Sequence, residues 1–171
     1  NNGEYMTHPA FISMGVNGFW VGKYETGYLG ATTKATAQKN EANAAKIIIK
    51  PNVFSWRNIK VMFAFQNAYN YQRDMDSHMM KNTEWGAIAI LAHSKYGTGQ
   101  EIRNNNNSNA KTGYGALLTS LQHTYTGVSG DGGSYNSAYN TDAGYLASTT
   151  GNITGVYDMA GGAHELMASY F

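Results

Sequence analysis

Hydrophobic and polar positions along the first fifty residues predict two strands joined by an irregular excursion. Aromatic and β-branched residues dominate residues 18–26, with Trp20 and Tyr24 on one alternating face, which is typical of a strand. Residues 47–51 form a short apolar run that ends at a Pro, which predicts an edge strand or another extended segment. Residues 27–46 are rich in Ala, Thr, Lys and Asn with weak periodicity, so we expect a surface excursion that carries some helix.

The next segment repeats apolar residues three and four positions apart, which predicts a helix with one buried face. The residues of this face are Val61, Ala64, Phe65, Ala68 and Tyr71. A polar side chain before the helix, Ser55 or Asn58, is expected to cap its first turn.

A second helix is predicted from a shorter apolar stripe and from signals at both ends. The stripe consists of Trp85, Ile88, Ala89 and Ala92. We expect Asn82 or Thr83 at the cap, and Gly97 at the left-handed position that follows many helices. Glu84 in the first turn and His93 in the last turn agree with the helix dipole.

The pattern changes in residues 100–152, where no helical period survives and Asn, Gly, Ser and Tyr recur. We expect a long loop region with short strands. Tyr offers rigid contact area at low entropic cost, and Ser, Gly and Asn add adaptable hydrogen bonds, so this mixture is typical of binding loops. The alternative is a loop that packs on itself. The predicted ligand contacts are Tyr114, Tyr125, Tyr135, Asn136, Tyr139 and Asn140.

Composition excludes several classes of function. The chain of 171 residues contains no Cys, which excludes disulfides, thiolate metal sites and a Cys nucleophile. The formal net charge of +1 provides no electrostatic argument for a nucleic-acid partner, which needs a basic face. Charged residues make up 13% of the chain, against about 25% in an average domain. No apolar run approaches the roughly 20 residues that span a bilayer, so we expect no membrane insertion.

Signals for catalysis or metal binding are sparse. None of the five His residues forms an i, i+4 pair of the zinc-protease type, and neither a nucleophile-elbow motif nor a phosphate-binding loop motif is present. In a Gly-rich turn, however, Asp158 lies seven residues before Glu165, and oxygen ligands on such a turn could hold calcium. The alternative is that these carboxylates accept backbone N–H groups.

Four short motifs occur in order along the chain: FWVGKYET at residues 19–26, PNVFSW at 51–56, KNTEWG at 81–86 and GVYDMAGGAHEL at 155–166. Together they resemble the opening strand, the approach to the first helix, the start of the second helix and the GLxDMxGNVWEW signature of the formylglycine-generating-enzyme-like (sulfatase-modifying factor) domain. That domain is a branch of the C-type lectin fold. The resemblance implies an α+β fold with two helices packed on a small, twisted, mainly antiparallel sheet and with long loops.

Residues 80–86 and 147–153 resemble the version of this domain found in surface and phage-associated proteins of gut bacteria. The resemblance implies an extracellular location, on a bacterial cell surface or a virion. The family continues past the Asp-Met signature with further strands. We therefore expect residues 1–171 to form a single but incomplete C-type-lectin-like domain.

The activities of the resembled family depend on residues that this chain does not match. The oxidase uses a pair of copper-binding Cys residues, and another branch uses a His-based iron site, so we expect no enzyme and no redox metal. The family's Gly-Asn-x-Trp-Glu segment often helps to bind calcium. Glu165 matches this segment, whereas Gly162 and His164 stand at the Asn and Trp positions.

These observations favour a non-enzymatic binding module that recognises a glycan or protein receptor. A structural subunit of an extracellular fibre or phage tail, whose loops pack against neighbouring copies, is the first alternative. A metal-dependent oxidase of the same family is the second.

Overall fold

The computed structural model describes residues 9–12, 14–99, 102–105, 107, 109–114, 116–118, 125–127, 139, 148–149, 151 and 155–169. The helices in this part of the chain are α1 (Pro9–Ile12), α2 (Val61–Tyr71) and α3 (Asn82–His93), with 3-10 turns η1 (Ala44–Lys46) and η2 (Arg73–Met75). The strands are β1 (Gly27–Tyr28), β2 (Ile47–Ile48), β3 (Ala116–Leu118) and β4 (Tyr125–Gly127). The fold is therefore α+β, as the sequence predicts. None of the helices in the described part is long and apolar enough to cross a membrane.

Both sheets have two antiparallel strands. β1 pairs with β2, with Gly27 opposite Ile48, and β3 pairs with β4, with Leu117 opposite Thr126. The chain at residues 54–56 lies along the other side of β1: the amide of Tyr28 donates to the carbonyl of Phe54 (3.1 Å), and the amide of Trp56 to the carbonyl of Thr26 (2.8 Å). β1 is thus held from both sides although it is only two residues long.

The close approach on this side of β1 depends on a residue without a side chain. A Cβ atom at Gly27 would lie 2.5 Å from Cγ2 of Val53, so only Gly leaves room for the neighbouring chain. Trp56 is buried here; its indole N–H donates to the carbonyl of Lys39 (2.6 Å), and its ring meets Tyr28 edge to face.

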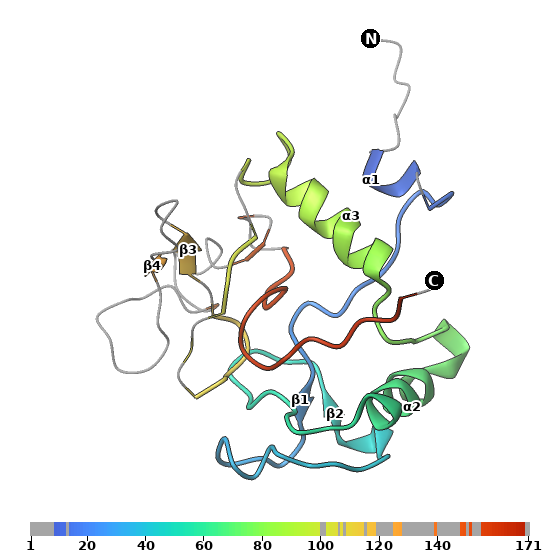
Figure 1. The fold of residues 1–171 in the computed structure, drawn as a ribbon, viewed down its shortest axis with the longest axis vertical. Helices are drawn as coiled ribbons and strands as arrows, with labels where there is room; N and C mark the ends of the chain where they lie inside the picture. Colours follow the sequence, from blue (N-terminus) through green and yellow to red (C-terminus); the bar gives the residue numbers. More distant parts are fainter. Residues whose placement is uncertain are drawn as a thin grey trace.

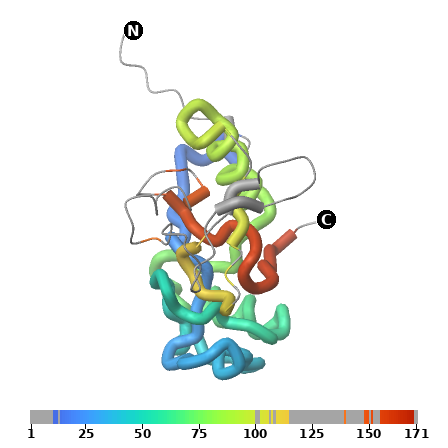
Figure 2. Tube along the Cα trace, turned by 90° about the vertical axis from the view of Figure 1, so that its left-hand side faces the viewer, coloured from blue at the N-terminus to red at the C-terminus, as the bar shows by residue number. Residues whose placement is uncertain are grey.

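Apart from β3 and β4, the elements form two groups with the C-terminal segment between them. α3 and α1 lie at one end of the molecule, and β1, β2 and α2 lie at the other, while residues 155–169 run between the two groups (Figures 1 and 2). Ala168 is fixed to the start of α3, because its amide donates to the carbonyl of Met80 and its carbonyl accepts from the amide of Asn82 (both 2.9 Å).

The predicted strand over residues 18–26 is wrong. Residues 18–22 have no regular secondary structure, and Trp20 is 96% exposed whereas Tyr24 is partly covered. A strand needs a partner for its amides and carbonyls, and no described segment pairs with residues 19–22. The first strand begins only at Gly27, whereas the predicted strand at residues 47–51 is confirmed in β2.

Both predicted helices are confirmed, but the buried face of α2 differs from the prediction. Val61 and Phe65 of the predicted buried face are more than half exposed. The buried residue of α2 is Asn67, whose side-chain amide donates to the carbonyl of Glu41 (3.0 Å). This side of the helix is therefore held by a polar contact to the preceding loop.

The beginnings of the two helices also differ from the prediction. The cap residues are Lys60 on α2 and Lys81 on α3, and neither caps its helix with a side-chain hydrogen bond. At α3 the carboxylate of Glu84 instead accepts the amide of Lys81 (2.8 Å). An acidic residue in the first turn thus satisfies an amide that the helix leaves open.

At the end of α3, Gly97 is not in the left-handed conformation; Gly99 is, with φ of 64°. Gly97 is required for a different reason: a Cβ atom there would overlap the carbonyl of Ala92. The predicted buried stripe of α3 is confirmed at Ile88 and Ala92, which are buried together with Ala87.

Candidate functional site

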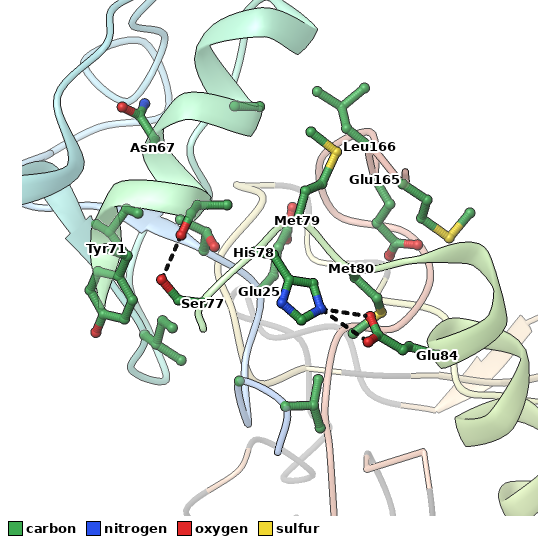
Figure 3. Close-up of a pocket in the computed structure, with 18 of the residues that line it drawn as sticks. Glu25, Asn67, Tyr71, Ser77, His78, Met79, Met80, Glu84, Glu165 and Leu166 are labelled. Atoms are coloured by element: carbon green, nitrogen blue, oxygen red, sulfur yellow. Dashed lines mark hydrogen bonds and ion pairs between the residues drawn. The ribbon is translucent and has the colours of Figure 1, made fainter. Parts of the chain in front are cut away.

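A groove with a volume of about 690 Å³ lies between α2 and α3. Its walls are formed by residues 19–22 and 24–26, by α2, by residues 72 and 75–80 of the linker and by the first turn of α3. Residues of the C-terminal segment, from Tyr157 to Met167, form its remaining side. Figure 3 shows His78, Met79 and Met80 on the linker that crosses between the two helices, with Glu165 beside them. The volume is within the range of about 300–1,000 Å³ that is usual for ligand pockets.

Three carboxyl groups from distant parts of the chain meet at this groove: Glu25, Asp158 and Glu165. Burial is the main cause that raises the pKa of Glu25 and of Glu165, and the charge of Asp158 raises both further, so the three groups are electrostatically close. No Lys or Arg is among the described residues that line the groove. The carboxyl groups are therefore removed from water without a cation to compensate them.

Asp158 is the most strongly bonded of the three. It is 5% exposed, and its carboxylate accepts the amide of Gly113 (2.8 and 2.9 Å), the side-chain amide of Asn105 (2.8 Å) and the amide of Glu25 (3.3 Å). Burial raises the pKa of Asp158 to about 6, and these N–H donors oppose the rise because they favour the charged form. Asp158 thus joins three segments of the chain.

Glu25 lies between Asp158 and the turn at residues 161–162. The hydroxyl of Ser55 donates to its Oε2 (2.6 Å), and a Cβ atom at Gly162 would lie 2.8 Å from the same oxygen. Burial raises the pKa of Glu25 to about 8, the Ser55 hydrogen bond lowers it, and the charges of Asp158 and Glu165 raise it further. Near neutral pH, Glu25 is therefore largely a neutral carboxylic acid.

Glu165 is the member of the group with an unused acceptor. Its Oε1 is buried and has no hydrogen-bond partner in the structure. Burial raises the pKa of Glu165 to about 8, the indole N–H of Trp85 lowers it, and the charge of Asp158 raises it. Because an unmet buried acceptor costs free energy, a donor from a ligand at this oxygen would be favourable.

His78 forms a separate charged unit beside the first turn of α3. Its Nδ1 lies 2.6 Å from the carbonyl of Asp76, and its Nε2 lies 3.0 Å from Oε1 of Glu84 (Figure 3). Because a carbonyl and a carboxylate only accept, both ring nitrogens must donate, so the geometry fits an imidazolium. The two acceptors accordingly raise the pKa of His78.

The predicted ligand-binding tyrosines are only partly described. Tyr114 is 7% exposed; its ring meets Tyr139 edge to face, and its hydroxyl lies 3.1 Å from Oδ1 of Asn52. Tyr139 also meets Tyr24 edge to face. These two rings belong to a packed aromatic cluster, in which Tyr24 stacks on Tyr157, and this cluster lies beside the groove.

The other predicted loop contacts remain predictions. Tyr125 is the first residue of β4, where the structure describes the backbone and not the side chain. Tyr135, Asn136 and Asn140 lie outside the described residues.

The predicted calcium site is brought together only in part. Asp158 and Glu165 do line the same groove, but both oxygens of Asp158 already accept N–H donors. Within the described residues, no group of three or more His, Asp or Glu side chains is arranged to hold a metal ion. Calcium binding at Asp158 and Glu165 stays a prediction.

Sequence reasoning missed Glu25 and Asn105. Glu25 belongs to the segment of residues 18–26, for which the sequence predicts a strand, and it is 133 residues from Asp158. Asn105 is one of the four consecutive Asn residues, yet its side chain is buried and donates to the carbonyl of Lys111 and to Asp158 (both 2.8 Å). The run of Asn residues was the available signal, because several amide side chains in a row can satisfy the backbone groups of an irregular segment.

Comparison with known proteins finds no match for this chain among family models, curated proteins or solved structures.

Proposed function

We propose that this chain is a non-enzymatic binding module, and that the groove between α2 and α3 is its binding site for a glycan or protein receptor. The observation that carries the proposal is the groove itself, with a volume of about 690 Å³ and walls that are mostly apolar. Ligand sites of proteins are concave, largely apolar and equipped with a few placed polar groups. Glu25 and Glu165 are such groups here.

Trp20 supports this assignment from the rim of the groove. It is 96% exposed and continuous with the apolar walls of the groove, and an exposed apolar surface beside a pocket is typical of an interaction site. Trp is also among the residue types that contribute most to binding when a partner covers them.

The resemblance to the formylglycine-generating-enzyme-like domain supports two finer parts of the proposal. The first is a C-type-lectin-like arrangement of the α+β fold. The second is display outside the cell, on a bacterial surface or a virion, where a binding module would meet its receptor. The lack of the family's copper-binding Cys residues supports the assignment to a binding module over an oxidase.

The test is a pair of substitutions at exposed aromatic residues, with a glycan array and a displayed library of random peptides as probes. Trp20→Ala removes the rim of the groove, and Tyr96→Ala removes an exposed ring beyond the end of α3, away from the groove lining. We expect Trp20→Ala to reduce binding of the recovered ligands at least tenfold and Tyr96→Ala to leave it unchanged. Equal binding by both variants would place the site elsewhere and contradict the proposal.

A structural role is the second candidate, and one feature of α2 favours it. Val61, Phe65 and Tyr69 follow one another at four-residue spacing on its exposed side, and the rings of Phe65 and Tyr69 are stacked. This stripe would suit packing against a neighbouring copy in a fibre or virion. Light scattering after size-exclusion chromatography tests it: self-association that Phe65→Ser abolishes would favour the structural role.

A further inference from the structure

The groove walls carry more acidic than basic residues, although the whole chain has nearly equal numbers of both. The described lining contains five acidic residues and no Lys or Arg, whereas the chain has 11 acidic and 12 basic residues. The acidic lining residues are Glu25, Asp76, Glu84, Asp158 and Glu165.

The fold provides positive partners at only one of these positions. Glu84 is paired with His78, and the Nζ of Lys81 lies 3.9 Å from the same carboxylate. Among the described residues, no ion pair reaches Glu25, Asp158 or Glu165. Within the described structure Glu25, Asp158 and Glu165 therefore have no cationic partner, and a ligand could supply one.

The geometry points to a partner polypeptide that places a Lys or Arg side chain, carried between apolar residues, in this groove so that it donates to Glu165. This inference rests on the proposed function and specifies its ligand. The lining has acidic residues and no Lys or Arg, so an ammonium or guanidinium group would meet acceptors and no competing cation from these two residue types, and Oε1 of Glu165 is a buried acceptor without a donor.

The walls around Glu165 fit the aliphatic part of such a side chain. Met79, Met80 and Leu166 line the same groove as Glu165, and in Figure 3 the carboxylate of Glu165 is turned toward the linker at Met80. Long cationic side chains bury their methylene groups on apolar surface while the charged head meets its acceptor. Methionine side chains adapt to irregular partners, which suits a groove that receives a peptide.

Unpaired backbone favours a polypeptide over a small amine. Residues 19–22 and 164–167 both line the groove, and within the described structure no backbone hydrogen bond joins either segment to another. Amides and carbonyls left open in this way are what an added peptide backbone uses when it binds along a chain edge. A free alkylamine would satisfy Glu165 but not these groups.

Protonation does not oppose the inference. Burial raises the pKa of Glu165 to about 8 in the absence of a partner, so the group is largely neutral near pH 7. A cation at hydrogen-bond distance would favour the ionised form and release the proton. Asp158, Glu25 and the exposed His164 also lie on this side of the groove. Asp158 and Glu25 are carboxyl groups, so neither can supply a positive charge that would compete with the ligand for Glu165.

The test selects peptides from a displayed library of 12-residue random sequences on the immobilised chain, and measures the best peptide by calorimetry. We expect the selected sequences to be enriched in Lys or Arg next to Leu, Ile, Phe or Trp. Replacing the basic residue of the peptide by norleucine should weaken binding at least tenfold. Glu165→Gln should do the same, whereas Asp74→Asn, at an exposed position outside the groove lining, should have no effect.

Each outcome decides for or against the inference. Selected peptides without a basic residue, or equal affinity of the Glu165→Gln and Asp74→Asn variants, would overturn it. Glycans that bind at the groove and lose affinity with Trp20→Ala would also overturn it, while the proposed function would stand. Peptides or glycans whose affinity does not change with Trp20→Ala would contradict the proposed function itself. Thermal melting of each variant confirms that it is folded, and the substitution in the peptide leaves the protein unchanged.

Discussion

Asp158 shows how one side chain can hold several loops together. Its carboxylate receives N–H donors from Glu25, Asn105 and Gly113, which belong to segments that have no sheet or helix to order them. A buried carboxylate with several donors is stable only while all of them are in place. The residue therefore has a structural task in addition to lining the groove.

We expect Asp158→Asn to destabilise the fold by about 2–3 kcal/mol, because the new amide group would face N–H donors where the carboxylate accepted them. Urea denaturation followed by circular dichroism measures this loss. Asp74→Asn, at an exposed position in η2, is the matched control and should change the free energy of unfolding by less than about 0.5 kcal/mol. Equal stability of the two variants would contradict the role assigned to Asp158.

The turn at Gly161 provides a second prediction about a single residue. Gly161 has φ of 78°, and a Cβ atom there would overlap the side chain of Asn104 and lie 2.8 Å from the amide nitrogen of Asn105. Gly30 has φ of 89° with open space around it, so Gly30→Ala measures backbone strain alone, about 1 kcal/mol. Gly161→Ala should lower the free energy of unfolding by at least twice that amount in the same denaturation experiment. A loss no larger than that of Gly30→Ala would mean that Asn104 and Asn105 can shift freely.

The helices show which properties of an element are local. The presence of α2 and α3 could be predicted because the helical spacing of apolar residues is a property of the local sequence, whereas their cap residues differ from the prediction. The buried face of α2 could not, because η1 and the loop at Glu41 decide which side is covered, and they cover Asn67 rather than Phe65. Residues 18–22 failed as a strand for the same reason: pairing depends on a partner that the local pattern does not contain.

Some residues of the candidate site could likewise be predicted from the local sequence, and others could not. Asp158 and Glu165 could be found in one Gly-rich turn, because they are seven residues apart. Glu25 could not be joined to them, since only the folded chain brings it to Asp158 across 133 positions. The exposed position of Trp20 is likewise a property of the fold and not of its neighbours in sequence.

A substitution at Gly86 tests how much a Gly inside α3 lowers the stability of the fold. The residue lies inside the helix, and a Cβ atom there would meet no other atom within 4 Å. Gly86→Ala should stabilise the fold by up to about 1 kcal/mol, because Ala loses less backbone entropy in a helix. Differential scanning calorimetry should show a rise in melting temperature of about 2–4 °C. Gly99→Ala, where φ is 64° and the space is also open, should instead lower it.

For the whole molecule, the buried carboxyl groups predict the dependence of stability on pH. Burial raises the pKa of Glu25 and Glu165 to about 8 and that of Asp158 to about 6, so the folded state holds these protons more tightly than the unfolded state does. Stability is then fully present below the unfolded pKa values of about 4 and is lost as pH rises toward 8. The raised pKa of His78 acts in the same direction.

We therefore expect the melting temperature to fall steadily between pH 5 and pH 8, by about 2–4 °C for each kcal/mol lost. Glu25→Gln removes one titrating group and keeps an acceptor for the Ser55 hydroxyl, so its melting temperature should fall less over this interval. Asp74→Asn, at an exposed position, should follow the unsubstituted chain. A stability that rises between pH 5 and pH 8 would show that the carboxyl groups are ionised and compensated in the fold.

The position of Trp20 gives the groove a built-in optical signal. The chain has three Trp residues, and in the fold Trp56 is buried and Trp85 is partly covered, while Trp20 stands in water at the groove rim. Emission at long wavelength, and quenching by dissolved iodide, should therefore come mainly from Trp20. A ligand that enters the groove would shift this emission to shorter wavelength and shield it from iodide. Occupancy can thus be followed by fluorescence in the unlabelled protein.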